Sequence, residues 1–306
     1  MEYVLTTDAM CKSYKKHKAL DNFSMHIPKG AIYGIVGKNG AGKTTLIRLI
    51  CGLQMPDSGG YTLYGCESKS VEIAKARRRM GAIVETPSVY LDMSARDNIR
   101  EQYRVLGMPS YEGIDDLLKL VGLECTGGKK VKHFSLGMRQ RLGIAVALAG
   151  SPDFIILDEP ANGLDPEGIV EIRELILKLN REKQITVLIS SHILDELSKL
   201  ATHYGFIDSG RLIKEISASE LESLCRKCTR VKVSDIKALC LALDDIGLEY
   251  AAVSEDTADI YGAFSISALV EALSRNKCEV LSMNGRDESL ESYYINLLGK
   301  RGEVKV

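Results

Sequence analysis

The segment with the clearest chemistry is Gly37-Lys38-Asn39-Gly40-Ala41-Gly42-Lys43-Thr44-Thr45. Its spacing, G-x-x-x-x-G-K-[ST], is that of a phosphate-binding loop. An apolar run at 31–36 precedes it and a helical pattern with one apolar face follows, so the loop should join a strand to a helix. Backbone N–H groups and the helix dipole attract phosphate oxygens there. We predict that Lys43 reaches the β- and γ-phosphates of a nucleotide and that the Thr44 hydroxyl binds Mg²⁺.

Two carboxylates follow a second apolar run, at the place where a buried strand should end. Residues 154–157 read Phe-Ile-Ile-Leu, and Asp158 and Glu159 come next. Continuous apolar runs are typical of strands buried on both faces of a parallel sheet, whose carboxyl ends carry the ligand. Asp158 is therefore predicted to hold Mg²⁺, directly or through water. Glu159 is predicted to orient and polarise the water that attacks the γ-phosphate.

A histidine follows a third apolar run. Residues 185–189 are apolar and lead into Ser190, Ser191 and His192. A lone histidine usually has a structural role. His192, however, lies one helix and one strand beyond Asp158, which should bring it to the same edge of the sheet. We predict that it faces the γ-phosphate.

Two other residues could contact a nucleotide, and each has a plain structural alternative. Ser135 begins a predicted helix at 136–148, with Gly137 in its first turn, so hydroxyl and N–H groups could form a second anion site. The alternative is an ordinary helix cap. Tyr14 lies in a basic, turn-prone segment that follows a short strand at 3–7. It could stack on a base, or it could be a half-buried tyrosine of an antiparallel sheet.

Strands that alternate with helices must position these residues. Their order predicts an α/β fold with a mostly parallel sheet, an antiparallel β subdomain and a helical insert at about 86–150. This domain should span residues 1–216. Beyond a linker at 217–228, residues 229–306 show the strand–helix–strand–strand–helix–strand order of a small ferredoxin-like α+β domain, followed by a last helix at 288–298. The second domain contains no catalytic constellation, so its expected role is interaction or regulation.

Composition narrows the class of protein. The chain has 306 residues and a formal net charge of −1, so no basic field points to nucleic acid. No run approaches the roughly 20 apolar residues that cross a bilayer, and because no basic stretch followed by an apolar one opens the sequence, we expect no secretory signal. The eight cysteines are scattered. The lone pair Cys225 and Cys228 is interpreted as incidental rather than as a zinc site, which favours a reducing cytoplasmic environment.

Taken together, the motifs resemble those of the ATP-binding subunits of ABC transporters, over about residues 1–215. They occur in the order of that family: an aromatic residue at Tyr14, the phosphate loop, a signature helix at 135–140, the Walker B run at 154–159, the turn Asn162-Gly163-Leu164-Asp165, and the switch histidine His192. The signature reads Phe-Ser-Leu-Gly-Met where the common form is Leu-Ser-Gly-Gly-Gln. Glu85 stands where most members have glutamine. These departures and the tail domain resemble the bacitracin- and lantibiotic-resistance exporters.

The resemblance implies ATP and Mg²⁺ as cofactors and assigns roles to the residues. Lys43, Glu159 and His192 would be catalytic. Thr44, Asp158 and Glu85 would lie at the metal, Glu85 directly or through its water shell, unless it is merely a solvated strand-end glutamate. The further residues expected at the nucleotide are Tyr14, the phosphate loop, Ser135, Gly137 and Asp165. Asp165 would either reach across a dimer or hold its own loop, and both possibilities stay open.

The resemblance also implies partners. Two subunits, either two copies or one copy and a close homologue, would pair head to tail with ATP between one phosphate loop and the other signature helix. They would power a separate transmembrane permease at the cytoplasmic face of the membrane, exporting an antimicrobial peptide or similar amphiphile. The surface at 86–103 is the expected dock. The alternative is a soluble ABC-type regulatory ATPase acting on a protein or ribosome partner rather than a permease. An ATPase acting on ribosomes or DNA would be expected to have tandem cassettes or a long coiled-coil insertion, and this sequence shows neither.

Overall fold

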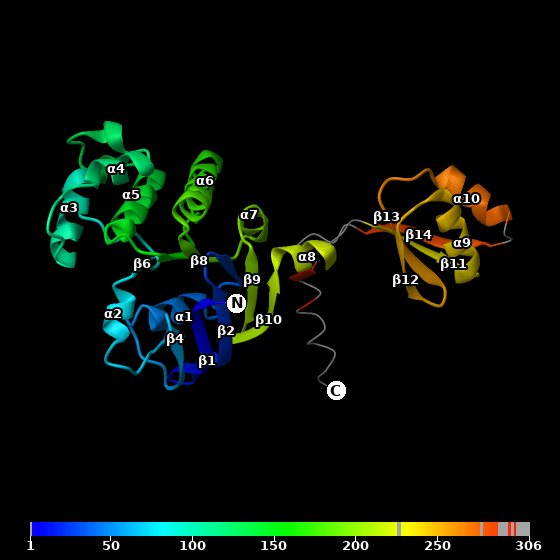
Figure 1. The fold of residues 1–306 in the computed structure, drawn as a ribbon, viewed down its shortest axis with the longest axis horizontal. Helices are drawn as coiled ribbons and strands as arrows, with labels where there is room; N and C mark the ends of the chain where they lie inside the picture. Colours follow the sequence, from blue (N-terminus) through cyan, green and yellow to red (C-terminus); the bar gives the residue numbers. More distant parts are fainter. Residues whose placement is uncertain (1, 225–227, 276–277, 287–292, 295–296, 298–306) are drawn as a thin grey trace. The chain divides into compact units, whose positions relative to one another are not determined.

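The computed structural model describes residues 2–224, 228–275, 278–286, 293–294 and 297. The chain forms two compact units, residues 1–218 and 219–306, and each is described by itself (Figure 1). The last helix expected at 288–298 and the cysteine at 225 fall largely or wholly outside the described residues.

The elements of the first unit, in chain order, are β1 (Tyr3–Tyr14), β2 (His17–Pro28), β3 (Ile32–Val36), α1 (Lys43–Ile50), β4 (Ser58–Leu63), β5 (Cys66–Glu67), α2 (Ile73–Arg77), β6 (Met80–Ile83), α3 (Ala95–Leu106), α4 (Ile114–Leu120), η1 (Glu124–Thr126), η2 (Val131–His133), α5 (Leu136–Leu148), β7 (Phe154–Asp158), α6 (Pro166–Lys183), β8 (Thr186–Ser191), α7 (Leu194–Ser198), β9 (His203–Asp208) and β10 (Arg211–Ser217).

A six-stranded sheet in the order β10-β9-β3-β8-β7-β6 forms the centre of this unit. Its strands are parallel except β10, which runs antiparallel to β9. Every residue of β3 and β7 is buried, as the continuous apolar runs predict. Figure 1 shows α6 and α7 on one side of the sheet, and α1 with an antiparallel sheet on the other. The predicted α/β class is therefore confirmed.

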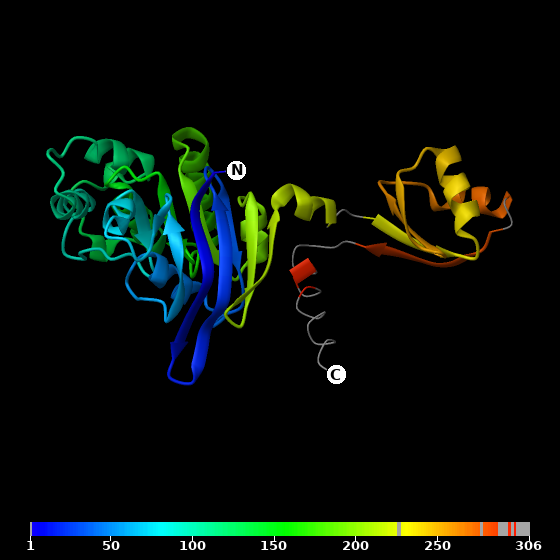
Figure 2. The same cartoon turned by 60° about the horizontal axis from the view of Figure 1, so that its bottom comes forward.

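The antiparallel sheet has the order β2-β1-β4-β5, and its long first two strands stand out in Figure 2. Phe23 and Met25 of this sheet pack with Leu46 of α1 against the parallel sheet. The strand predicted at 3–7 in fact continues to Tyr14. Its polar end stays extended because Lys12 pairs with Asp57, at 2.9 Å between Nζ and Oδ1, while β2 lies alongside.

The helical insert gathers α3, α4 and α5 at one end of the first unit (Figure 1). It is joined closely to the edge strand β6. A Cβ placed on Gly81 of β6 would lie 2.2 Å from the carbonyl oxygen of Ala147 in α5. A Cβ on Gly143 of α5 would lie 2.7 Å from Cβ of Pro87. Only glycine allows these two approaches, so α5 rests directly on the sheet edge.

The second unit has the predicted order of strands and helices. Its elements are β11 (Cys228–Val233), α9 (Ile236–Ile246), β12 (Tyr250–Ser254), β13 (Thr257–Tyr261), α10 (Ile266–Arg275) and β14 (Val280–Arg286), with a sheet order of β12-β13-β11-β14. Val231, Leu239, Ile260 and Leu269 belong to its own apolar core. In the stretch expected as a linker, α8 (Ala218–Leu224) forms a short helix.

Two further features of the described residues concern environment. The seven described cysteines are all free, and burial raises the pKa of the Cys51 thiol to about 12, which keeps it protonated and unreactive. Within the described part of the chain, no helix combines the length and the apolar character that crossing a bilayer requires.

Candidate functional site

The phosphate loop joins β3 to α1. Packing against neighbouring strands requires glycine at two positions of this loop, in addition to the room for phosphate that the sequence predicts there. Gly42 has a φ of 112°, and a Cβ there would lie 2.5 Å from the carbonyl oxygen of Ala19 in β2. A Cβ on Gly37 would lie 2.6 Å from the carbonyl oxygen of Ile207 in β9. The loop is therefore pressed onto strands β2 and β9, neither of which the sequence pattern revealed.

Lys43 is buried, with 5% of its side chain exposed, and its ammonium group lies inside the loop. Nζ donates hydrogen bonds to the carbonyl oxygens of Gly37 at 2.7 Å and Lys38 at 3.3 Å. It also lies 3.2 Å from Oε1 of Glu159. A compact positive charge is thus held where the loop was predicted to receive phosphate.

Glu159 connects Lys43 to the predicted switch histidine. While Oε1 faces Lys43, Oε2 lies 2.7 Å from Nδ1 of His192. The backbone of Glu159 has a φ of 47°, a left-handed conformation that costs a non-glycine residue about 1 kcal/mol or more. The three residues that the sequence predicts as catalytic therefore lie together, and a strained backbone holds the central one.

Asp158 is 1% exposed and only half satisfied. Its Oδ1 accepts a hydrogen bond from Oγ of Ser190 at 2.6 Å, while its Oδ2 has no hydrogen-bond partner among the described residues. An unpaired buried carboxylate oxygen is costly unless a cation or a water satisfies it. The residues present therefore fit a magnesium ion, with Asp158 and the Thr44 hydroxyl at the first turn of α1 as the groups to hold it.

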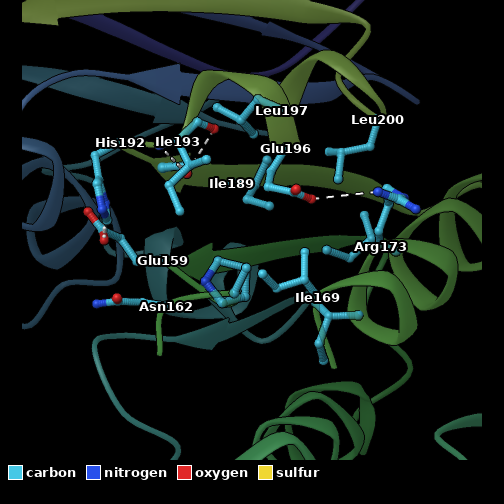
Figure 3. A pocket seen from close by; sticks show the side chains of 15 residues that line it. Glu159, Asn162, Ile169, Arg173, Ile189, His192, Ile193, Glu196, Leu197 and Leu200 are labelled. Carbon is cyan, nitrogen blue, oxygen red and sulfur yellow. Dashed lines mark hydrogen bonds and ion pairs between the residues drawn. The ribbon is translucent and has the colours of Figure 1, made fainter. Parts of the chain in front are cut away.

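A small cavity lies beside this cluster. Figure 3 shows Glu159 and His192 pointing toward each other at one end of it, with Arg173 and Glu196 at the other. Apolar side chains of β8, α6 and α7 line most of it. Its volume is about 20 Å³, room for about one water molecule, so it is a packing gap rather than a ligand pocket.

Comparison with known proteins shows to which family the chain belongs. The sequence profile of the ABC transporter family matches residues 20–162. The chain is 38% identical to the bacitracin transport ATP-binding protein BcrA of Bacillus licheniformis, with 98% of each chain covered. It is 46% identical to the lantibiotic transport ATP-binding protein SrtF of Streptococcus pyogenes over 70% of this chain and 92% of that one.

The chain belongs to the ABC transporter ATP-binding proteins. A dimeric structure of MJ0796, described as a bacterial ABC transporter cassette, has the same fold with a TM-score of 0.63 and 26% identity, covering 70% of this chain and 98% of that one. The resemblance stated from the motifs is thereby confirmed. As a member of this family, the protein binds nucleotide and is an ATPase.

Two of the predicted nucleotide contacts of this ABC protein lie outside the catalytic cluster. Glu85, just after β6, forms an ion pair with Arg48 of α1 and is 56% exposed, with a left-handed φ of 64°. The Tyr14 hydroxyl, at the end of β1, donates a hydrogen bond to Gln54, and the residue is 39% exposed. Among the described residues, no hydrogen bond or ion pair joins either side chain to Lys43.

The signature helix and the turn after Walker B adjoin each other. Ser135 caps α5, its Oγ accepting from the Met138 N–H at 3.2 Å, and a Cβ on Gly163 would lie 3.4 Å from Cδ2 of Leu136. Asp165 caps α6, its Oδ1 accepting from the Gly168 N–H at 3.1 Å. Within this chain Asp165 therefore holds its own helix start. In the described part of the ABC protein, no hydrogen bond or ion pair joins Ser135 to the phosphate loop.

Ser190 is the site residue that sequence reasoning missed. The sequence pattern presents it only as part of the polar end of an apolar run. Its position in the sheet could have revealed it, because Ser190 pairs with Asp158 where the parallel strands β7 and β8 lie side by side.

Proposed function

We propose that this ABC ATPase powers a separate transmembrane permease that exports an antimicrobial peptide or a similar amphiphile. Its relatives named for bacitracin and lantibiotic transport support the substrate class, and the bacitracin relative matches both units of the chain. The observation that carries the catalytic part is the cluster of Lys43, Glu159 and His192 beside the half-satisfied Asp158. The protein would act at the cytoplasmic face of the membrane, bound there through the permease.

The cluster suggests how hydrolysis is timed. Both carboxylate oxygens of Glu159 are engaged, one by Lys43 and one by His192. The γ-phosphate of ATP carries more negative charge than Glu159, so it would attract both the Lys43 ammonium group and the His192 ring. Its arrival would free Glu159 to accept a proton from the attacking water. A magnesium ion held by Asp158 and Thr44 would neutralise charge developing on the phosphates.

The signature helix supports a head-to-tail dimer. Ser135 and its helix start form an arrangement suited to an anion, no hydrogen bond among the described residues joins Ser135 to Lys43 or Glu159, and the neighbouring Leu136 is 49% exposed. We propose that a second copy, or a close homologue, supplies the γ-phosphate that this serine contacts. Each site would then be complete only when two chains close on ATP.

The proposed dock for the permease is a cleft of about 230 Å³ next to Glu85. It lies between the edge strand β6, α5 and α3, and Pro87 and Ser88 of the expected docking surface line it. Among the described residues that line it, Arg78 alone carries a charge. Polar and apolar residues share this lining, so a permease segment that inserts a few side chains of both kinds would fit it, and the position of the cleft beside Glu85 would relate docking to the nucleotide site.

Co-purification tests the permease and its dock together. Affinity capture of the tagged chain from detergent-solubilised membranes should recover a multi-span membrane protein. Leu106→Asp places a charge in the cleft lining and should lower this recovery at least about tenfold. Val105→Asp is the matched control, because Val105 is 77% exposed and outside the lining. Equal recovery with both variants would contradict the dock, and capture of a ribosome or soluble protein instead would overturn the transport function.

The role of Glu85 can be separated from that of its partner. Because the ion pair with Arg48 is largely exposed, Glu85→Gln should change the free energy of unfolding by less than about 1 kcal/mol. We expect Glu85→Gln to lower ATP-driven transport by the assembled complex severalfold, while Arg48→Gln, which removes only the partner, leaves it near the wild-type rate. If the two variants behave alike, or neither changes transport and turnover, Glu85 does not report the nucleotide state.

A further inference from the structure

Ser190 lies on β8, next to the two carboxylate residues at the end of β7, Asp158 and Glu159. The residue is fully buried at the end of β8. Its hydroxyl donates to Oδ1 of Asp158 at 2.6 Å and accepts from the Glu159 N–H at 2.9 Å. A serine hydroxyl has one proton to give and lone pairs to accept, so a single side chain serves both residues.

The two bonds have separate consequences. The bond to Asp158 occupies Oδ1, and Oδ2 is thereby the oxygen without a partner among the described residues. The Glu159 N–H is shared between this hydroxyl at 2.9 Å and the carbonyl oxygen of Ser190 at 3.2 Å, and together they hold the peptide that precedes the left-handed φ of 47°. That conformation persists only where surrounding contacts determine it. The hydroxyl thus determines which oxygen of Asp158 is engaged and, with the Ser190 carbonyl oxygen, holds the backbone of Glu159.

We infer that Ser190 is a positioning residue for both functions of this site: it turns Asp158 Oδ2 toward Mg²⁺ and places Glu159 for the attacking water. This inference rests on the magnesium role proposed above. Groups that orient metal ligands typically affect metal affinity or activity by about 10- to 100-fold when they are removed. A serine that merely fills space would have no such effect.

Nucleotide binding with and without the metal provides the test. Binding of a fluorescent ATP analogue to Ser190→Ala should match wild type within about twofold in EDTA, since the phosphate loop is untouched. When Mg²⁺ is titrated in, Ser190→Ala should need at least a roughly tenfold higher Mg²⁺ concentration than wild type to reach half of the maximal change in nucleotide binding. Its turnover at saturating Mg²⁺ should also fall about tenfold or more. Ser190→Cys, similar in size but with a weak donor, should show the same defect if the alanine variant does not fold.

Thr186→Val is the matched control. Thr186 is a buried hydroxyl residue at the opposite end of β8, and its Oγ1 accepts from the Gly30 N–H at 2.9 Å. The Thr186→Val variant measures how the loss of a buried β8 hydroxyl affects stability alone. The Mg²⁺ dependence of its nucleotide binding and turnover should stay that of wild type. If the Ser190 variants keep the wild-type Mg²⁺ dependence, the inference is wrong. If wild-type binding and turnover do not respond to Mg²⁺, the proposed metal role fails instead.

Discussion

Replacing Glu159 with glutamine should reduce ATP turnover by at least about 100-fold while ATP binding persists. The carboxylate is the group positioned to accept a proton, and the amide cannot do so at neutral pH. Glutamine keeps the size of the side chain and can still contact Lys43 and His192, which now lie 3.2 and 2.7 Å from the two carboxylate oxygens. The loss should therefore fall on the chemical step.

Turnover, nucleotide affinity and dimer formation are the three measurements. Because trapped ATP would keep the proposed dimer closed, the Glu159→Gln protein should elute as a dimer with ATP and as a monomer without it. Glu174→Gln is a suitable control, since Glu174 is 66% exposed on α6 and pairs only loosely with Arg173. Undiminished hydrolysis in Glu159→Gln would remove Glu159 from its catalytic role.

Replacing Lys43 with alanine should weaken ATP binding by about 100-fold. Its ammonium group is the buried positive charge of the loop, and charge-assisted hydrogen bonds contribute roughly 1.5–3 kcal/mol each. Two such bonds to phosphate oxygens, each at the lower end of this range, would account for the expected factor. The truncation also leaves the carbonyl oxygen of Gly37 and Oε1 of Glu159 without the lysine, while Oε2 of Glu159 keeps its contact with His192.

Equilibrium titration with a fluorescent nucleotide measures this loss, and thermal unfolding shows whether the fold survives. Lys29→Ala is the matched control, because Lys29 precedes β3 and pairs with Glu2 at the surface. Its affinity for ATP should equal that of wild type. An affinity within threefold of wild type for Lys43→Ala would mean that the lysine only braces the loop.

That Lys43, Glu159 and His192 lie together was predictable, because their positions follow a rule of parallel sheets. Three strands are long apolar runs in the sequence, and each leads to its functional residue: Lys43 after β3, Asp158 and Glu159 at β7, and His192 after β8. Burial on both faces demands the apolar run, and the residues next in the chain gather at the carboxyl edge of the sheet. Locating these residues needed no knowledge of the tertiary contacts.

Other features depend on partners distant in sequence. Strand β2 alternates polar and buried residues and pairs with β1 through several register shifts, so neither its length nor that of β1 can be read from one segment. The ion pair between Arg48 and Glu85 joins residues 37 positions apart. Ser190 acquires its contacts only because β7 and β8 pair in a particular register. Sequence periodicity carries no information about such encounters.

The contact between Gly81 and Ala147 has a mechanical consequence. It pins the C-terminal part of α5 to the rim of the sheet, while Ser135 stands at the opposite end of that helix. With 1.5 Å of rise per residue, Leu136 lies about 16 Å along the helix axis from Ala147, so any tilt of α5 about this contact would move the Ser135 end more than the end held by the sheet. Pro87 meets the same helix one turn away, at Gly143, so a partner that occupied the proposed cleft would act close to the end of α5 that the sheet holds.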